Sequence, residues 1–157
     1  MITEDYVSLE TAKLLKEKGF KEWCFKCYGV AVLYNGADIS FDEECELKDE
    51  GRENEIEYVE GGRLYDYGCN NRDKDAKVWA APTLWVAMKW LKEVHHYYIQ
   101  VMLDSWACGG HSGYYVVIQK TNSEFEIMLS DKTDEVFYDE PEQAYEAAIK
   151  YCLENLV

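Results

Sequence analysis

The residues with the clearest potential for chemistry are four zinc-type ligands in two closely spaced pairs. Cys24 and Cys27 form a CxxC motif, and Cys108 and His111 form a CxxH motif far downstream. Zinc takes four soft or borderline ligands in a tetrahedron, and a two-residue gap allows both members of a pair to bind one ion. Glycines beside both motifs supply the backbone freedom that tight ligand loops need. The spacing therefore predicts a zinc-stabilised domain with these four residues as ligands.

The sequence around the CxxC motif also contains an argument against zinc. It is rich in aromatic and β-branched residues, which predicts a strand, and side chains three positions apart on a strand point to opposite faces of the sheet. The alternative is that Cys24 and Cys27 are half-buried strand thiols. A redox-active motif is disfavoured, because activation of the thiolate uses a helix that starts after the motif, whereas here a helix precedes it and a strand follows.

Cys108 and His111 also have the side-chain types of a nucleophile and its base, with Asp104 as a candidate orienting group. This arrangement would suit a small hydrolase. However, no second motif supplies an oxyanion site, and the glycines between these residues are typical of a hairpin loop. The chain is therefore expected to lack catalytic activity and to need no cofactor other than the zinc considered above.

A second candidate site consists of tyrosines on two expected strands. Tyrosine supplies 13 of the aromatic residues, which together make up 15% of the chain. Because neighbouring residues on a strand point to opposite faces, the pairs Tyr97–Tyr98 and Tyr114–Tyr115 place one ring on each face of a sheet. One face packs on helices, and the other either presents tyrosines or is covered by the N-terminal strands. An open face predicts a protein partner or self-association.

Length and composition limit the classes of protein that fit. The chain has 157 residues, an apolar content of 48% and a formal net charge of −15. This length suits a single domain, residues 1–157, that buries a core without disulfides, so the cysteines are expected to be free thiols. Nucleic acids and anionic membranes both bind basic surfaces, so neither is an expected partner. The first residues lack a basic start and an apolar stretch, so a cytoplasmic protein is expected.

Acidic residues concentrate between residues 38 and 60, which hold 11 of the 31 acids and only two basic residues. Like charges at this density repel one another and disfavour compaction. Residues 42–60 are therefore expected to be mostly loop, with an edge strand near 55–59. The same cluster suggests an alternative function, an acidic nucleic-acid mimic that inhibits a DNA-binding protein. The competing interpretation is that the excess of acidic residues only keeps the protein soluble.

Periodicity and turn signals predict the element order α-βββ-α-βββ-α. Ser8 is the expected cap of a first helix that ends at Gly19. Pro82 is expected in the first turn of a second helix, and Asp139 is the expected cap of the last one. Strands are expected near 23–34, 38–41, 63–67, 97–103, 114–119 and 125–129. The sequence therefore predicts an α+β fold, with three helices packed on one face of an antiparallel sheet or sheets.

Residues 6–19, 81–91 and 146–156 cover the three expected helices. Together they resemble a group of short, uncharacterised proteins of gut bacteria and their prophages, which implies a setting in a mobile element and no particular activity. Residues 82–157 also follow the α-β-β-β-α order of the double-stranded-RNA-binding domain. The last helix begins with glutamates where that family places lysines, so RNA binding is not expected. The favoured function is a non-catalytic protein-interaction module.

Overall fold

The computed structural model describes residues 4–104, 113–133 and 137–157. Its helices are α1 (Leu9–Glu17), α2 (Phe41–Asp49), α3 (Leu84–His95) and α4 (Pro141–Asn155). Its strands are β1 (Cys27–Tyr34), β2 (Ala37–Asp38), β3 (Ile56–Tyr65), β4 (Val78–Ala80), β5 (Tyr97–Asp104), β6 (Gly113–Lys120) and β7 (Glu126–Met128). The prediction of an α+β fold with antiparallel sheets is confirmed. No helix in the described ranges is both long enough and apolar enough to cross a membrane.

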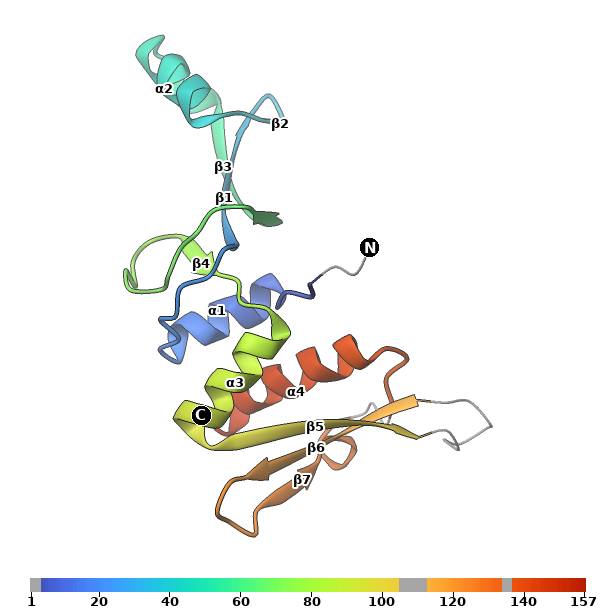
Figure 1. Ribbon diagram of the computed structural model, residues 1–157. Coiled ribbons are helices and arrows are strands. Elements are labelled where there is room, and N and C mark those ends of the chain that lie inside the picture. The colour runs from blue at the N-terminus through green and yellow to red at the C-terminus, as the bar shows by residue number, and fades with distance from the viewer. Residues whose placement is uncertain (1–3, 105–112, 134–136) are drawn as a thin grey trace.

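The strands form two antiparallel sheets with helices α1, α3 and α4 between them (Figure 1). In the first sheet, β1 pairs with β3 along one side and with β2 and β4 along the other. The second sheet has the order β5-β6-β7. Helices α3 and α4 pack on one face of this second sheet and contact β5. The N-terminal strands therefore lie away from its other face.

β1 and β3 extend beyond the helices as a two-stranded arm that carries α2 at its end (Figure 1). Ser40 caps α2: its hydroxyl accepts from the Glu43 amide at 3.3 Å, and the Glu43 carboxylate accepts from the Ser40 amide at 2.8 Å. The expectation that residues 42–60 are mostly loop is therefore wrong. Asp42, Glu43 and Glu44 occupy the first helical turn, where free amides and the helix dipole stabilise negative charge.

The expected order with three helices is also wrong, because α2 adds a fourth helix and interrupts the first group of strands. The return strand expected near 38–41 is reduced to β2, since α2 begins at Phe41. From α3 onward the order α3-β5-β6-β7-α4 agrees with the prediction.

Two of the expected helix starts need correction. Thr83 caps α3, and its hydroxyl accepts from the amide three residues later at 3.3 Å, so Pro82 lies before the helix rather than in its first turn. α4 begins at Pro141 with Glu140 as the cap residue, and Asp139 is outside. The fixed φ angle of proline suits the first helical position, and this helix starts without a side-chain cap.

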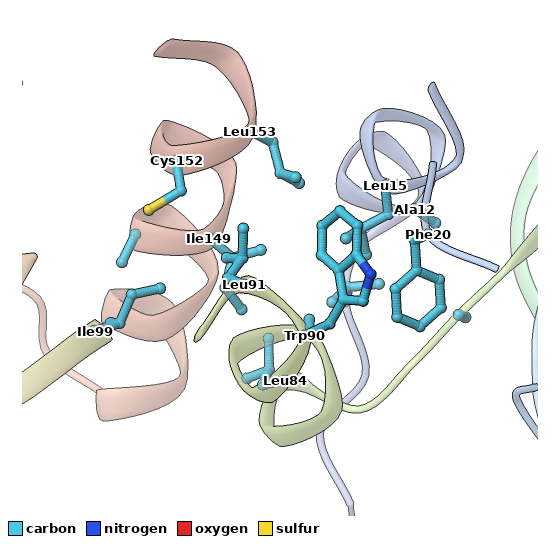
Figure 2. Packing of buried hydrophobic residues seen from close by; sticks show 14 of the residues in the cluster. Ala12, Leu15, Phe20, Leu84, Trp90, Leu91, Ile99, Ile149, Cys152 and Leu153 are labelled. Atoms are coloured by element: carbon cyan, nitrogen blue, oxygen red, sulfur yellow. The ribbon is translucent and has the colours of Figure 1, made fainter. Parts of the chain in front are cut away.

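The core lies where α1, α3 and α4 meet (Figure 2). The ring of Trp90 on α3 packs edge-on against that of Phe20, with centroids 5.5 Å apart. Figure 2 shows the same indole beside Leu15 of α1. From α4, fully buried side chains pack toward α3 and β5: Ala148, Ile149, Cys152 and Leu153. This core fixes α3 on the second sheet and thereby sets the space between α3 and β5.

His95, the last residue of α3, is a half-buried histidine in the same core. Its ring lies edge-on to Trp90 with centroids 4.6 Å apart, and its Nε2 atom is buried without a hydrogen-bond partner among the described residues. Burial, followed by the nearby charges of His96 and Lys18, lowers the pKa of His95 below its ordinary value of 6.5. The fold therefore favours the neutral ring.

Acidification is expected to destabilise the protein through His95. Below about pH 6.5 the unfolded chain binds a proton that the folded His95 resists, so the free energy of unfolding falls by at most about 1.4 kcal/mol per pH unit. Urea unfolding near neutral pH and near pH 5.5 measures this for the wild type and for His95→Phe, which keeps a ring against Trp90. The variant is expected to lose less stability on acidification, and equal losses in both proteins would contradict the role of His95.

Candidate functional site

The structure places only the first pair of predicted zinc ligands among its described residues. Cys27 lies in β1, whereas Cys24 precedes the strand and pairs with Cys69 through two backbone hydrogen bonds of 2.9 Å. Cys108 and His111 lie outside the described residues, so the zinc site stays a prediction. Within the described ranges, no group of three or more Cys, His, Asp or Glu residues is arranged to hold a metal ion.

Cys24, Cys27 and Cys69 form a buried thiol cluster at the base of the arm. Their exposed fractions are 5%, 4% and 8%, and the thiol of Cys27 interacts with that of Cys69. Burial raises the pKa of Cys24 to about 11 and that of Cys69 to about 12. These thiols are therefore protonated at neutral pH and are poor nucleophiles. Cys69 was not predicted as part of this cluster, because the two asparagines after it are typical of a turn. Nothing in the sequence indicates that its backbone pairs with that of Cys24.

The tyrosine pairs place their rings on both faces of the second sheet. Tyr97 is 9% exposed and Tyr114 packs against the core, both on the face that carries the helices. Tyr98 is 42% exposed on the opposite face, where the Tyr115 hydroxyl donates to the Met102 sulfur at 3.6 Å. The four-stranded sheet lies beyond the helices and does not cover this face (Figure 1). The interaction role of these tyrosines stays a prediction.

β5 is one of the two edge strands of its sheet, and the hydrogen bonds of β6 show which backbone groups of β5 bond to it. Tyr114 exchanges hydrogen bonds of 2.8 and 2.9 Å with Tyr138, on the side of β6 away from β5. The residues of β6 that alternate with Tyr114 therefore point their backbone groups toward β5. In the β5–β6 register, the partners of these β6 residues are Tyr98, Gln100, Met102 and Asp104. These four residues of β5 therefore form the backbone hydrogen bonds to β6.

The remaining backbone groups of β5 face away from β6. Amides and carbonyls alternate in direction along a strand, so those of Ile99, Val101 and Leu103 point to the open edge. The same alternation extends to His96, two residues before Tyr98, whose carbonyl accepts from the Thr121 amide at 2.7 Å on the β6 side. No strand of the described structure pairs with the open edge. β5 therefore presents a row of free donors and acceptors.

β5 also lacks the features that usually protect an edge strand. Lysine, proline and bulges blunt such edges in other proteins. Residues 97–104 contain neither lysine nor proline, and they pair with β6 without a register shift. β3, an edge strand of the first sheet, carries Glu57 and Arg63 and has an irregular register opposite β1. Of these two strands, β5 is the one suited to receive another strand.

A groove runs along the open edge of β5 and encloses about 500 Å³. Five consecutive residues, 98–102, line one wall, which means that the edge of the strand forms this wall rather than one of its faces. The other wall comes from α3 and α4 and consists of Trp85, Met88, Lys89, Lys92, Glu93 and Tyr145. We call this feature the β5 groove.

Exposed aromatic side chains contribute to the surface of the β5 groove. Trp85 is 71% exposed although it lies on a helix that packs on the core. Lys92, seven residues later on the same helix, lies near Tyr98, with its Nζ atom 5.3 Å from the centre of the tyrosine ring. Large apolar side chains beside a free strand edge are typical of a surface that binds another protein.

Sequence reasoning found the elements that build the β5 groove but not the groove itself. Trp85 lies outside the apolar stripe of Leu84, Ala87 and Leu91 on its helix, and an aromatic residue outside such a stripe is a signal for a binding surface. Tyr145 follows the apolar spacing of α4 with Ala148 and Ile149, yet it is half-buried and lines the groove. No signal in the sequence indicates that β5 is an edge strand.

Comparison with known proteins identifies no relative of this chain: no protein-family model, no curated protein and no solved structure matches it significantly. The resemblance to proteins of gut bacteria and prophages stays a prediction, and the likeness to the double-stranded-RNA-binding domain is not confirmed. The geometry of β5 and of the groove beside it therefore provides the basis for inferring a function.

Proposed function

We propose that this protein is a non-catalytic interaction module that binds an extended segment of a partner protein by adding a strand to β5. The observation that carries the proposal is the row of outward amides and carbonyls of Ile99, Val101 and Leu103, which opens into the β5 groove. In strand addition, main-chain hydrogen bonds supply affinity, and adjoining pockets select alternate side chains of the bound segment.

The composition of the β5 groove supports this proposal over catalysis. Trp85 and Tyr98 belong to the residue types that most often dominate binding energy at protein interfaces. The charged side chains that line the groove are two lysines and Glu93, and the Lys89 amino group lies 3.8 Å from the Glu93 carboxylate. This ion pair is exposed, and the described residues that line the groove include no serine, cysteine or histidine that it could activate in a reaction centre.

Hydrogen exchange tests the free edge directly. The amides of Ile99, Val101 and Leu103 are expected to exchange rapidly in the free protein, because nothing in the described structure accepts from them, whereas Gln100 and Met102 are protected by β6. Two-dimensional NMR of labelled protein measures each rate. Slow exchange at all of these positions in a dilute monomer would show that the edge is already covered, and the proposal would fail.

A matched pair of variants at Leu103 then tests strand addition. Leu103 is 56% exposed, and its amide points outward, so Leu103→Pro removes a donor that β6 does not use. Leu103→Ala keeps the amide and removes the same side chain. Binding of a selected extended peptide is expected to weaken about tenfold more in the proline variant, the effect of one or two lost main-chain hydrogen bonds. Equal affinities of the two variants would contradict strand addition.

Self-association through β5 is the alternative that the same experiment detects. An antiparallel pair of β5 strands from two copies is isologous, so protection of Ile99 and Val101 would rise with protein concentration. A sedimentation measurement over the same concentrations would show a dimer. Concentration-independent rapid exchange, followed by protection on addition of peptide, is the outcome expected for a heterologous partner.

The runner-up proposal is an acidic mimic of nucleic acid. The observation that favours it is that α2 holds exposed acids on an ordered helix at the end of the arm, including Asp42, Glu46 and Asp49. Reversing these three charges to lysine is expected to abolish inhibition of a DNA-binding target while leaving peptide binding at β5 unchanged. Retained inhibition after the reversal would refute the mimic.

A further inference from the structure

We infer that the segment bound at β5 runs antiparallel to it, with basic residues at its amino-terminal end and acidic residues or a free carboxylate at its carboxyl-terminal end. This inference rests on the proposed strand addition and specifies the chemistry of the partner. It comes from the different charges at the two ends of the β5 groove.

The direction of α3 defines these two ends. His96 adopts a left-handed conformation with a φ of 65°, so the chain reverses at once and α3 lies back along β5. Lys92, in the last turn of α3, therefore stands beside Tyr98 at the start of β5. Trp85 is 11 residues before His96, a helical rise of about 16 Å, which matches about five strand residues and places it opposite Val101.

The end of the groove near Trp85 is acidic. There the groove continues into a second hollow of about 350 Å³, which shares Trp85, Met88 and Tyr145 with it. The charged residues that line this hollow are all acids: Glu4, Asp5 and Glu142. The N-terminal segment is fixed in place there, because the Leu84 amide donates to the Asp5 carbonyl at 2.9 Å. A positively charged group of a partner is therefore favoured at this end.

The end near the start of β5 lacks this excess of acid, because the hollow that adjoins it there is lined by Lys92 and Lys120 as well as by Glu124 and Glu126. Lys89 and Lys92 line this end of the groove together with Glu93, which is paired with Lys89. Within the groove itself, Lys92 thus remains as the charge available to a partner, in a molecule whose net charge is −15. A carboxylate is favoured here, although the excess of acid elsewhere makes the acidic end the stronger determinant.

Strand direction follows from these charges. A segment antiparallel to β5 begins near Trp85 and ends near Lys92. If the segment is a free peptide, its own amino group then meets the acidic end and its own carboxylate meets Lys92. A parallel segment reverses both contacts, and parallel pairing is also slightly less stable per residue. Specificity then arises from charge order, with alternate apolar side chains contacting Trp85 and Tyr98.

Selection from a library of short random peptides displayed on phage tests the inference with the full-length protein. The enriched sequences are expected to have lysine or arginine at the amino-terminal positions, alternating apolar residues in the middle and acids at the carboxyl-terminal positions. A synthetic peptide of this type is expected to bind about tenfold more tightly than a peptide of the same composition with its charge order reversed, the effect of a few exposed ion pairs. The preference should shrink as salt is raised.

Two double variants separate the groove from the overall charge. Glu4→Lys with Glu142→Lys is expected to remove or reverse the charge-order preference. Glu46→Lys with Asp49→Lys changes the net charge equally at the end of the arm and is expected to leave the preference intact. As a further control, Trp85→Ala should weaken every selected peptide, whereas Phe25→Ala, which truncates an aromatic residue that is 82% exposed outside the groove, should not.

The outcomes distinguish this inference from the function on which it depends. Enriched peptides that protect the amides of Ile99 and Val101 but show no charge order would overturn the inference and leave strand addition standing. The opposite charge order would also overturn it. Enrichment that depends on Phe25 rather than Trp85, or no enrichment at all, would remove strand addition at β5 and this inference together.

Discussion

Glu146→Ala is expected to lower the free energy of unfolding by about 3 kcal/mol, because it leaves polar groups at the start of α1 without their acceptor. One carboxylate oxygen of Glu146, on α4, accepts from the Ser8 amide at 3.0 Å and from the hydroxyls of Ser8 and Thr11 at 2.5 Å. Thr11 is fully buried in the folded protein, so the substitution leaves its hydroxyl without this acceptor in the protein interior. The negative charge also lies at the N-terminus of α1, where the helix dipole favours it.

Glu146→Gln is the matched control for this prediction. Glutamine keeps an acceptor oxygen of the same reach and removes the charge, so about 1 kcal/mol of destabilisation is expected. Urea unfolding followed by tryptophan fluorescence measures both variants. A change below about 0.5 kcal/mol for Glu146→Ala would show that these hydrogen bonds do not hold α1 against α4. Tyr145, next to Glu146 on α4, lines the β5 groove. If Glu146→Ala loosens α4 as expected, the variant should therefore also bind peptides more weakly.

The second large effect is expected in alkaline solution. Burial raises the pKa of Cys152 and of Cys69 to about 12 and that of Cys24 to about 11, from an ordinary value of 9.0. In the unfolded chain these thiols ionise near pH 9, whereas the folded protein keeps them protonated. The contribution of these thiols to the free energy of unfolding is therefore fully present below about pH 9. It is lost as the pH rises toward their pKa values in the folded protein. By pH 10 the fully buried Cys152 accounts for a loss of about 1.4 kcal/mol.

The three thiols together are expected to remove on the order of 3 kcal/mol by pH 10, since Cys24 and Cys69 keep a small exposed fraction and count for less than Cys152. Urea unfolding at pH 8 and 10 under reducing conditions measures the loss. Cys152→Ala lowers stability at both pH values by opening a small cavity, but its alkaline loss is expected to be smaller by about 1.4 kcal/mol. An alkaline loss identical to that of the wild type would contradict the role of the buried thiol.

The sequence was most informative where a structural signal is local. Ser8 and Gly19 mark the ends of α1 correctly: the Ser8 hydroxyl accepts from the Thr11 amide at 3.3 Å, and Gly19 has a φ of +92°. β5, β6 and β7 follow the expected ranges closely, because the turn at 121–123 joins the last two without an intervening element. Capping and turn formation depend on a few neighbouring residues, so the sequence contains all the information they need.

The prediction of a loop at residues 42–60 was wrong because it counted the charges without considering where each one lies along the chain. Residues 42–60 were judged by their number of acids, whereas the structure shows that Glu44 also accepts from Lys48 at 2.6 Å, one helical turn later. Such pairs and the Ser40 cap make the first part of this segment the helix α2. On α3, Val94 continues the apolar spacing of Leu84, Ala87 and Leu91 but is 53% exposed, whereas Trp90 is buried against Phe20. Burial on a helix depends on which neighbours approach it.

By itself, the sequence determined an acidic α+β chain with a capped first helix and tyrosine pairs divided between two faces of a sheet. Only the tertiary structure decided that Cys69 joins Cys24, that α3 lies back along β5, and that β5 rather than β7 borders the groove. The physical reason is that a strand's pattern of side chains fixes its faces but not its neighbours. Backbone donors and acceptors are the same in every residue, so the free edge of β5 exists only once the order β5-β6-β7 is formed.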